Sequence, residues 1–316
     1  MFARSHLPSE RICVSNFQST SPNHRVTRSA AAFALACVLA LPGTAALAAP
    51  LDVPSGSTGH SHDDTSTPTL RLASVDNFRD VAGPGGGYPA AFGLHVEPGV
   101  FYRSNALTTS DADAAALDTL GISAVYDLRT DPEIADKPDR VPTGAAYVRH
   151  PLLSGDLSAT ADLKTPDDAR EFMRGINRSF VTDPEIRAEL GTMFTEFATT
   201  DGPQLFHCTE GKDRAGWTAA MLLSLVGVDR ETVYADYLLS NDYSAERIEA
   251  TLAAATEARG PEKAAVYAPM LGVERGFLEA GFDQLEADYG TVHNYLLTGL
   301  GLSPQTIAAL SAKLVA

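Results

Sequence analysis

The alternation of short apolar runs with longer amphipathic segments predicts a layered α/β fold. Residues 111–120 carry a helical pattern, with Ser110 at the N-cap position and Gly121 after its end. A second helix is expected over about 185–198, ahead of the last strand. Four short runs rich in branched and aromatic residues predict strands: 100–103, 122–126, 145–148 and 204–207. Strands that alternate with helices are typical of a central, mainly parallel sheet flanked by helices.

The C-terminal third carries an almost continuous helical pattern. Helices are predicted over 216–225, 230–239, 245–258, 276–289, 291–298 and 304–314. The stretch from Leu153 to Arg178 mixes helix and loop signals, and we interpret it as a helical lid or insertion over the site. From Leu70 to Ala316 we expect one domain without internal repeats.

The N-terminal residues have the pattern of an export leader. Residues 1–28 hold four arginines and one acidic residue, and an apolar run of about a dozen residues follows, too short to span a bilayer. The sequence Ala46-Leu-Ala48 is typical of a cleavage site. We therefore predict a signal peptide over 1–48, a secreted protein without stable membrane insertion after cleavage, and a flexible linker over 49–69, rich in Ser, Thr, Pro and Gly.

Removal of the leader would change the number of cysteines and the net charge. Two of the three cysteines lie in the leader, so Cys208 would be the only one left and no internal disulfide could form. The net charge of −16 would become more negative by three, because the leader is basic. Such a surface repels nucleic acid and anionic membranes, and we expect neither as a partner. An anionic substrate would need a positive potential local to its pocket.

The segment His207-Cys-Thr-Glu-Gly-Lys-Asp-Arg214 carries the candidate chemistry. A predicted strand ends there and a helix begins, so successive N–H groups and the helix N-terminus converge on a site of phosphate size. This environment favours the thiolate of Cys208, a nucleophile, while the planar guanidinium of Arg214 can hold two phosphate oxygens. The predicted phosphate-binding residues are Thr209, Glu210, Gly211, Lys212, Asp213 and Arg214. This chemistry needs no metal ion or other cofactor.

The loop resembles the C-x5-R loop of the cysteine-based phosphatases. The full run His-Cys-x-x-Gly-Lys-Asp-Arg is similar to that of a bacterial subfamily of secreted tyrosine phosphatases that also accept phosphoinositides. Further pieces follow in the family's order: 77–80 with Gly83, 102–104, 127–129, 236–241, and 289–290 with 295–296. The resemblance implies the cysteine-phosphatase fold and phosphotyrosine hydrolysis through a phosphocysteine. Phosphoserine, phosphothreonine and phosphoinositides are further implied substrates, so the expected partner is a phosphorylated protein or a phosphoinositide.

Several acids could protonate the leaving group. The resemblance implicates Asp213, whose alternative role is that of an acid at a helix N-terminus. Asp127, at a strand end, is either the acid or a residue that orients the loop. Asp156 and Asp183 lie in loops ahead of Cys208, but neither has the Trp-Pro-Asp context of the usual tyrosine phosphatases.

Other loop residues keep alternatives open. Lys212 is either a rim cation suited to multiply phosphorylated headgroups or a solvated lysine. Ala215 stands where most of these phosphatases have a hydroxyl that helps the thiolate leave, with Thr209 or Thr218 as replacements. Glu210 either points to solvent or weakens the positive potential of the loop, and both departures predict modest activity. The alternatives to an active phosphatase are a pseudophosphatase that binds phosphorylated ligands, a rhodanese-like sulfurtransferase and a buried structural cysteine.

Overall fold

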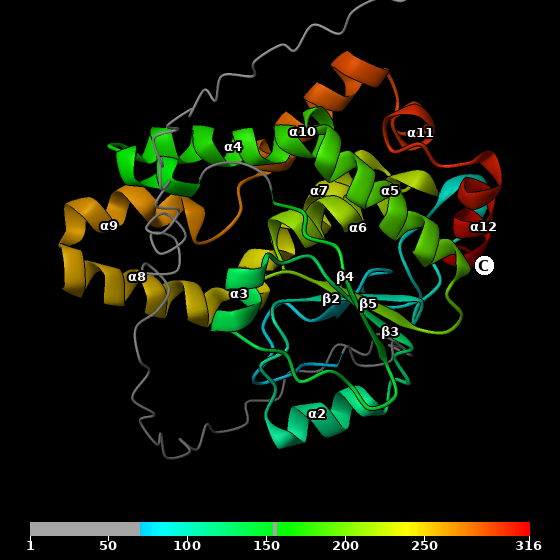
Figure 1. Ribbon diagram of the computed structural model, residues 1–316, viewed down its shortest axis with the longest axis horizontal. Helices are drawn as coiled ribbons and strands as arrows, with labels where there is room; N and C mark the ends of the chain where they lie inside the picture. The colour runs from blue at the N-terminus through cyan, green and yellow to red at the C-terminus, as the bar shows by residue number, and fades with distance from the viewer. Residues whose placement is uncertain (1–69, 154–156) are drawn as a thin grey trace, which may run out of the picture. The chain divides into compact units, whose positions relative to one another are not determined.

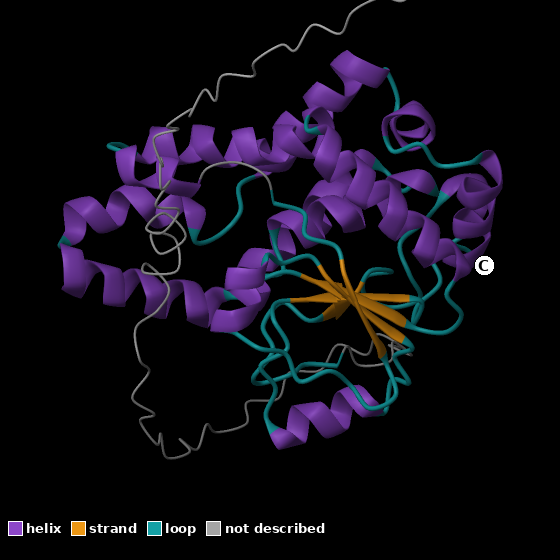
Figure 2. Cartoon of the chain, in the orientation of Figure 1, coloured by secondary structure: helices purple, strands orange, loops and turns teal. Residues whose placement is uncertain are grey.

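A computed structural model describes residues 70–153 and 157–316, so the predicted signal peptide and linker lie outside the described residues. A sheet lies between helices on its two sides (Figure 2). It has five strands in the order β1-β2-β5-β3-β4. The strands are β1 (Arg79–Asp80), β2 (Phe101–Ser104), β3 (Ala124–Asp127), β4 (Ala146–Arg149) and β5 (Gln204–His207). Strand β1 pairs with β2 in an antiparallel way, and the other three pairings of this sheet are parallel. The predicted fold class, a mainly parallel sheet flanked by helices, is confirmed.

The parallel register brings the carboxyl ends of three strands to one edge. His207 is opposite Ser104 of β2 and Asp127 of β3. All four residues of β3 and of β5 are buried, as expected for strands covered on both faces. The loop that follows β5 therefore begins at the middle of this edge, flanked by residues from both neighbouring strands.

Helices cover both faces of the sheet (Figure 1). On one face α2 contributes Leu117 to a small core with Val125 and Leu205. On the other face lie α5 and α6, in the larger core that includes Tyr126 and Phe206. The helices are α2 (Asp111–Asp118), α3 (Asp131–Asp136), α4 (Pro166–Thr182), α5 (Pro184–Thr199), α6 (Asp213–Leu225), α7 (Arg230–Tyr243), α8 (Ala245–Arg259), α9 (Pro261–Tyr267), α10 (Arg275–Tyr289), α11 (Val292–Asn294) and α12 (Pro304–Leu314). In the part of the chain that the structure describes, no helix is long and apolar enough to cross a membrane.

The predicted elements agree with the observed ones within a few residues. Ser110 caps α2 as expected, because its hydroxyl oxygen accepts from the Asp113 N–H at 3.1 Å. Three short elements among the strands and α-helices were not predicted, β1, α3 and α9, since two to seven residues give too little periodicity. The helix predicted over 291–298 is in fact the single turn α11 followed by a π-helical turn, η4 (Tyr295–Gly299).

Trp217 joins the helix of the candidate loop to the helical layer. Its ring is fully buried on α6, stacks on Phe180 of α4 and packs against Phe282 of α10. Gly281 of α10 makes this approach possible, because a Cβ at that position would lie 2.6 Å from the indole ring. The start of α6, and with it the loop, is therefore fixed from behind by close packing.

Candidate active site

The loop from Cys208 to Lys212 connects the end of β5 to the start of α6. Cys208 is 2% exposed and lines the base of a pocket. Gly211 has a φ of +67°, and a Cβ there would lie 2.5 Å from the carbonyl of Ser104 at the end of β2. Only glycine therefore allows the loop to turn so close to the sheet.

Two buried side chains hold the carbonyl groups of this loop from outside. Asn77 Nδ2 donates to the Gly211 oxygen at 2.8 Å and to the Glu210 oxygen at 3.3 Å. Arg103 Nη2 donates to the same Gly211 oxygen at 2.9 Å and to the Lys212 oxygen at 3.3 Å. Because the C=O and N–H of a trans peptide point in opposite directions, the following N–H groups point away from these donors. This arrangement is what an anion-binding loop requires.

An acid on α7 fixes both of these donors. Asp236 accepts from Arg103 at 3.0 Å and from Arg79 at 3.2 Å, and Arg79 in turn donates to the side-chain oxygen of Asn77. Burial alone would raise the pKa of Asp236, but the two guanidinium groups more than offset it and lower that pKa. Burial and the neighbouring Arg79 lower the pKa of Arg103 to about 10, so it remains a cation behind the loop at neutral pH.

Glu133 of α3 orients the guanidinium of Arg214. The contacts are bidentate, Nη2 to Oε1 at 2.6 Å and Nη1 to Oε2 at 2.9 Å, and Nη1 also donates to the Leu128 carbonyl at 3.1 Å. Burial would raise the pKa of Glu133, but the adjacent Arg214 holds it far below its usual range. The sequence interpretation missed Glu133. The only local signal was Thr130 three residues earlier, which forms a capping box with it.

Lys212 is neither the rim cation nor the solvated lysine that the sequence suggested. Its ammonium group is buried and donates to the carbonyls of Met270 at 2.8 Å and Gly272 at 3.0 Å. It also lies 3.0 Å from the carboxylate of Asp213. Lys212 thus ties the loop to the end of η3 (Ala268–Met270) and to Gly272 just after it.

Asp213 lines the same pocket as Cys208. Its side chain is 15% exposed and accepts from the Tyr237 hydroxyl at 3.2 Å. Asp183 instead caps α5, accepting from the N–H groups of Glu185 and Ile186. Asp156 lies outside the described residues. Of the proposed acids in the described residues, Asp213 alone lines this pocket.

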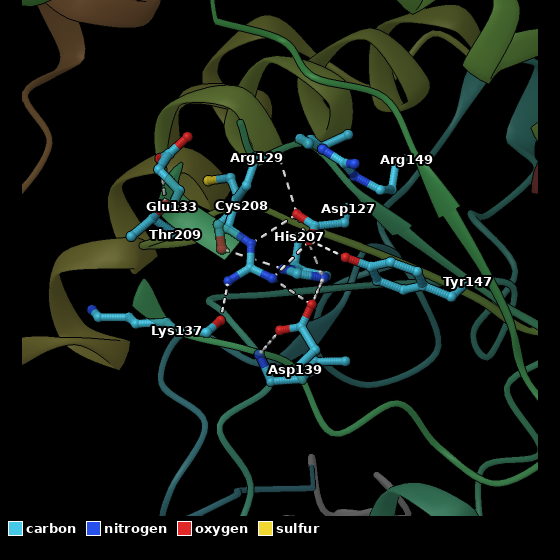
Figure 3. A network of polar contacts seen from close by, with 12 residues as sticks. Asp127, Arg129, Glu133, Lys137, Asp139, Tyr147, Arg149, His207, Cys208 and Thr209 are labelled. Atoms are coloured by element: carbon cyan, nitrogen blue, oxygen red, sulfur yellow. Dashed lines mark hydrogen bonds and ion pairs between the residues drawn. The ribbon is translucent and has the colours of Figure 1, made fainter. Parts of the chain in front are cut away.

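Asp127 belongs to a buried network behind the loop, not to the pocket (Figure 3). Arg129 binds both of its oxygens, at 2.8 and 2.7 Å, and the Tyr147 hydroxyl donates to it at 2.6 Å. Burial would raise the pKa of Asp127, but Arg129, His207 and Tyr147 together lower it to about 2. A fully buried carboxylate that stays ionised cannot deliver a proton to a leaving group. The geometry therefore speaks against Asp127 as the acid and favours its alternative role in orienting the loop.

The same network holds His207, the residue before Cys208. His207 Nε2 lies 3.3 Å from Asp139 and 4.0 Å from Asp127. Asp127, Asp139 and His207 present ligand atoms close enough for a metal ion, but the guanidinium of Arg129 already contacts both carboxylates. Arg129 thus places its positive charge between the two carboxylates, where a metal ion would otherwise lie.

Glu210 does not leave an uncompensated negative charge in the loop. Its carboxylate lies 2.7 Å from Arg247 of α8 and 3.5 Å from Lys137. Arg247 also lines the pocket and was not among the residues singled out in the sequence. Nothing in its local sequence distinguishes Arg247 from a surface arginine of a helix.

Neither threonine hydroxyl is free to replace the one missing at Ala215. Thr218 is fully buried and donates to the Arg214 carbonyl at 2.9 Å, within α6. Thr209 donates to Glu133 at 2.5 Å. Ala215 itself is fully buried in the first turn of α6.

The pocket combines a charged floor with an apolar wall. The floor holds Cys208 and Arg214, and the wall comes mainly from α4, the predicted lid segment, and from α9 and η3. The lining residues are Glu133, Leu153, Phe172, Met173, Ile176, Cys208, Thr209, Glu210, Lys212, Asp213, Arg214, Arg247, Tyr267, Met270 and Leu271. Gly211, predicted to bind phosphate, contributes the positive φ with which the loop turns close to the sheet.

The chain is similar in sequence to a known protein family and to several named proteins. The model of the tyrosine phosphatase family matches residues 70–316. The triple specificity protein phosphatase PtpB of Mycobacterium tuberculosis is 31% identical over 283 residues, covering 77% of this chain and 98% of the relative. A Cupriavidus necator protein provisionally named a tyrosine-protein phosphatase is 33% identical over 73% of this chain and 84% of its own. A tyrosine-protein phosphatase of Nostoc commune is 30% identical over 72% of this chain and 78% of its own.

Proposed function

Because this chain belongs to the tyrosine phosphatase family, we propose that it hydrolyses phosphotyrosine through a phosphocysteine intermediate at Cys208. The observation that carries the proposal is one pocket lined by the Cys208 thiol, the Arg214 guanidinium and the Asp213 carboxyl group. These three groups match the nucleophile, the phosphate clamp and the proton donor of this chemistry.

In the first step the Cys208 sulfur attacks phosphorus, and the bond from phosphorus to the tyrosine oxygen breaks. Asp213 gives its proton to the departing phenoxide. Arg214, held by Glu133, and the loop N–H groups stabilise the charge on the phosphoryl oxygens. In the second step water attacks phosphorus, Asp213 recovers a proton from that water, and the thiolate leaves with release of inorganic phosphate.

Two features separate this proposal from its alternatives. A pseudophosphatase would lack the nucleophile or the clamp, whereas Cys208 and the oriented Arg214 share one pocket. A sulfurtransferase is disfavoured by the family match over residues 70–316. The family resemblance also implied turnover of phosphoserine, phosphothreonine and phosphoinositides, which concerns the range of substrates and not the type of reaction.

We also propose export of the protein, on the basis of the basic and apolar leader pattern over residues 1–48.

A substrate panel with wild type and Cys208→Ser, in the presence of a chelator, tests the proposal. Phosphate release from a phosphotyrosine peptide is expected for the wild type, unaffected by the chelator and lost in the variant. A variant as active as the wild type would show that Cys208 is not the nucleophile. Binding of the peptide without phosphate release by the wild type would favour the pseudophosphatase.

A further inference from the structure

Every positively charged side chain that lines the described pocket is paired with an acid that lines it too. Arg214 contacts Glu133 at 2.6 Å, Lys212 contacts Asp213 at 3.0 Å and Arg247 contacts Glu210 at 2.7 Å. In addition, the carbonyl groups of Met270 and Gly272 accept from Lys212. The pocket therefore has no surplus of side-chain cations over side-chain anions.

This pairing limits what can bind beside the phosphate on Cys208. One phosphate is held by the loop N–H groups, the start of α6 and Arg214. A second phosphate would find only cations already bound to carboxylates, and it would have to displace Glu210 or Asp213 while lying close to them. Desolvation of an anion without a compensating partner and repulsion between like charges both oppose such binding.

The wall above the floor selects for the group that carries the phosphate. Phe172, Met173 and Ile176 of α4 face the same pocket as Tyr267, Met270 and Leu271. An aromatic ring packs well on such side chains, whereas the hydroxyl groups of an inositol ring would lose their water without gaining partners there. Phe172 and Ile176 are partly exposed, so they are available for contact with a ligand.

We propose that this pocket selects a singly phosphorylated aromatic phosphomonoester and discriminates against ligands with a second phosphate nearby. The inference rests on the proposed function and narrows its substrate class to phosphotyrosine whose neighbouring residues are uncharged. It assigns Glu210 and Phe172 as specificity-determining residues. Glu210, together with Asp76 at 3.3 Å, keeps Arg247 paired with carboxylates, and Phe172 supplies part of the surface on which the ring packs.

Three substrates test the inference with wild-type protein. They are a peptide with one phosphotyrosine among uncharged residues, the same peptide with a phosphoserine directly after it, and a water-soluble short-chain phosphatidylinositol 4,5-bisphosphate. We expect kcat/KM to fall by about tenfold or more when the second phosphate is added, with the inositol lipid no better. Equal efficiency on all three substrates would overturn the inference.

Variants of Glu210 test the charge pairing directly. Glu210→Gln should reduce the penalty for the second phosphate by at least about threefold, because Arg247 then keeps only Asp76, at 3.3 Å, as a carboxylate partner, and Lys137 loses its contact with Glu210. Glu210→Asp is the matched control, since it keeps the charge and should keep the penalty. An unchanged penalty in Glu210→Gln would show that the pairing does not set specificity.

Variants of Phe172 test the apolar wall. Phe172→Ala should raise KM for the phosphotyrosine peptide more than for an otherwise identical phosphoserine peptide, and Phe172→Leu should have a smaller effect. Equal changes for both peptides would contradict a role in packing on the ring. Hydrolysis of p-nitrophenyl phosphate by each protein, with Cys208→Ser as the blank, tests the proposed function separately from this inference. No hydrolysis by wild type would refute the proposed function, whereas hydrolysis without discrimination would refute only this inference.

Discussion

Glu133 and Arg214 form a bidentate ion pair whose two N–O distances are 2.6 and 2.9 Å. The carboxylate comes from α3 and the guanidinium from the first turn of α6, so the pair links two elements that are separated by 81 positions in the sequence. It fixes the plane of a side chain that must meet the phosphoryl oxygens, and its disruption should affect catalysis more than ligand capture.

Glu133→Gln should therefore lower kcat/KM for a phosphotyrosine peptide by about a hundredfold, because small errors in the position of a catalytic group are costly. The loss should fall mainly on kcat, and unfolding should become easier by about 2 kcal/mol, because Arg214 loses its charged partner. Steady-state kinetics and urea unfolding measure the two effects. Glu231→Gln is the matched control, since Glu231 contacts Arg275 in the same bidentate way on the surface and should change neither quantity. A Glu133→Gln enzyme with wild-type kcat would exclude this orienting role.

Asp213→Asn should distinguish a proton donor from a structural acid. Turnover of an alkyl phosphate is expected to fall by about a hundredfold, whereas p-nitrophenyl phosphate, with its good leaving group, should be affected far less. The ratio of the two rates in wild type and variant is the measurement. Comparable losses on both substrates would indicate that Asp213 serves only to hold Lys212 and the Tyr237 hydroxyl.

Asp127→Asn should weaken the protein without any preference among leaving groups. At neutral pH we expect a loss of about 3 kcal/mol in the free energy of unfolding, because Arg129 loses the charge of a buried partner. The pKa of Asp127 is lowered from 3.8 to about 2, so its ionisation stabilises the fold above pH 3.8, and this contribution disappears as the pH falls through about 2. Wild type and variant should thus converge in stability in acid. Urea unfolding at a series of pH values measures this, with Asp111→Asn, at an exposed ion pair, as the control. A difference that stays constant down to pH 2 would argue against the ionised carboxylate as its source.

Ala215→Ser tests whether the absent hydroxyl limits the second chemical step. If hydrolysis of the phosphocysteine is slow in the wild type, rapid mixing should show a burst of leaving group followed by a slow steady rate. The serine variant should raise the steady rate and reduce the burst amplitude, while the rate of the burst changes little. Because Ala215 is fully buried, the added hydroxyl should cost about 1 kcal/mol of stability. A wild type without a burst and a variant without a gain would mean that departure of the thiolate is not limiting.

The order of the elements and the identity of the loop could be read from the sequence, because both depend on local information. The Ser110 cap of α2, the apolar strand at Gln204–His207 and the helix Pro304–Leu314 are set by residues a few positions apart. The same holds for the run from His207 to Arg214, where the strand end, the glycine and the helix start lie within one loop.

The partners of the loop's charged side chains were decided only by the tertiary structure. Arg79 meets Asp236 across 157 positions, and Lys212 meets the Met270 carbonyl across 58. No periodicity or capping rule encodes such contacts, since they arise when separate elements pack on one sheet. The sequence therefore left Asp127 open as an alternative to Asp213, the proton donor that the family resemblance implicates. Packing buried Asp127 against Arg129 and left Asp213 in the pocket, because a charge in the interior needs a partner, whereas a charge at the pocket can exchange protons with a ligand or solvent.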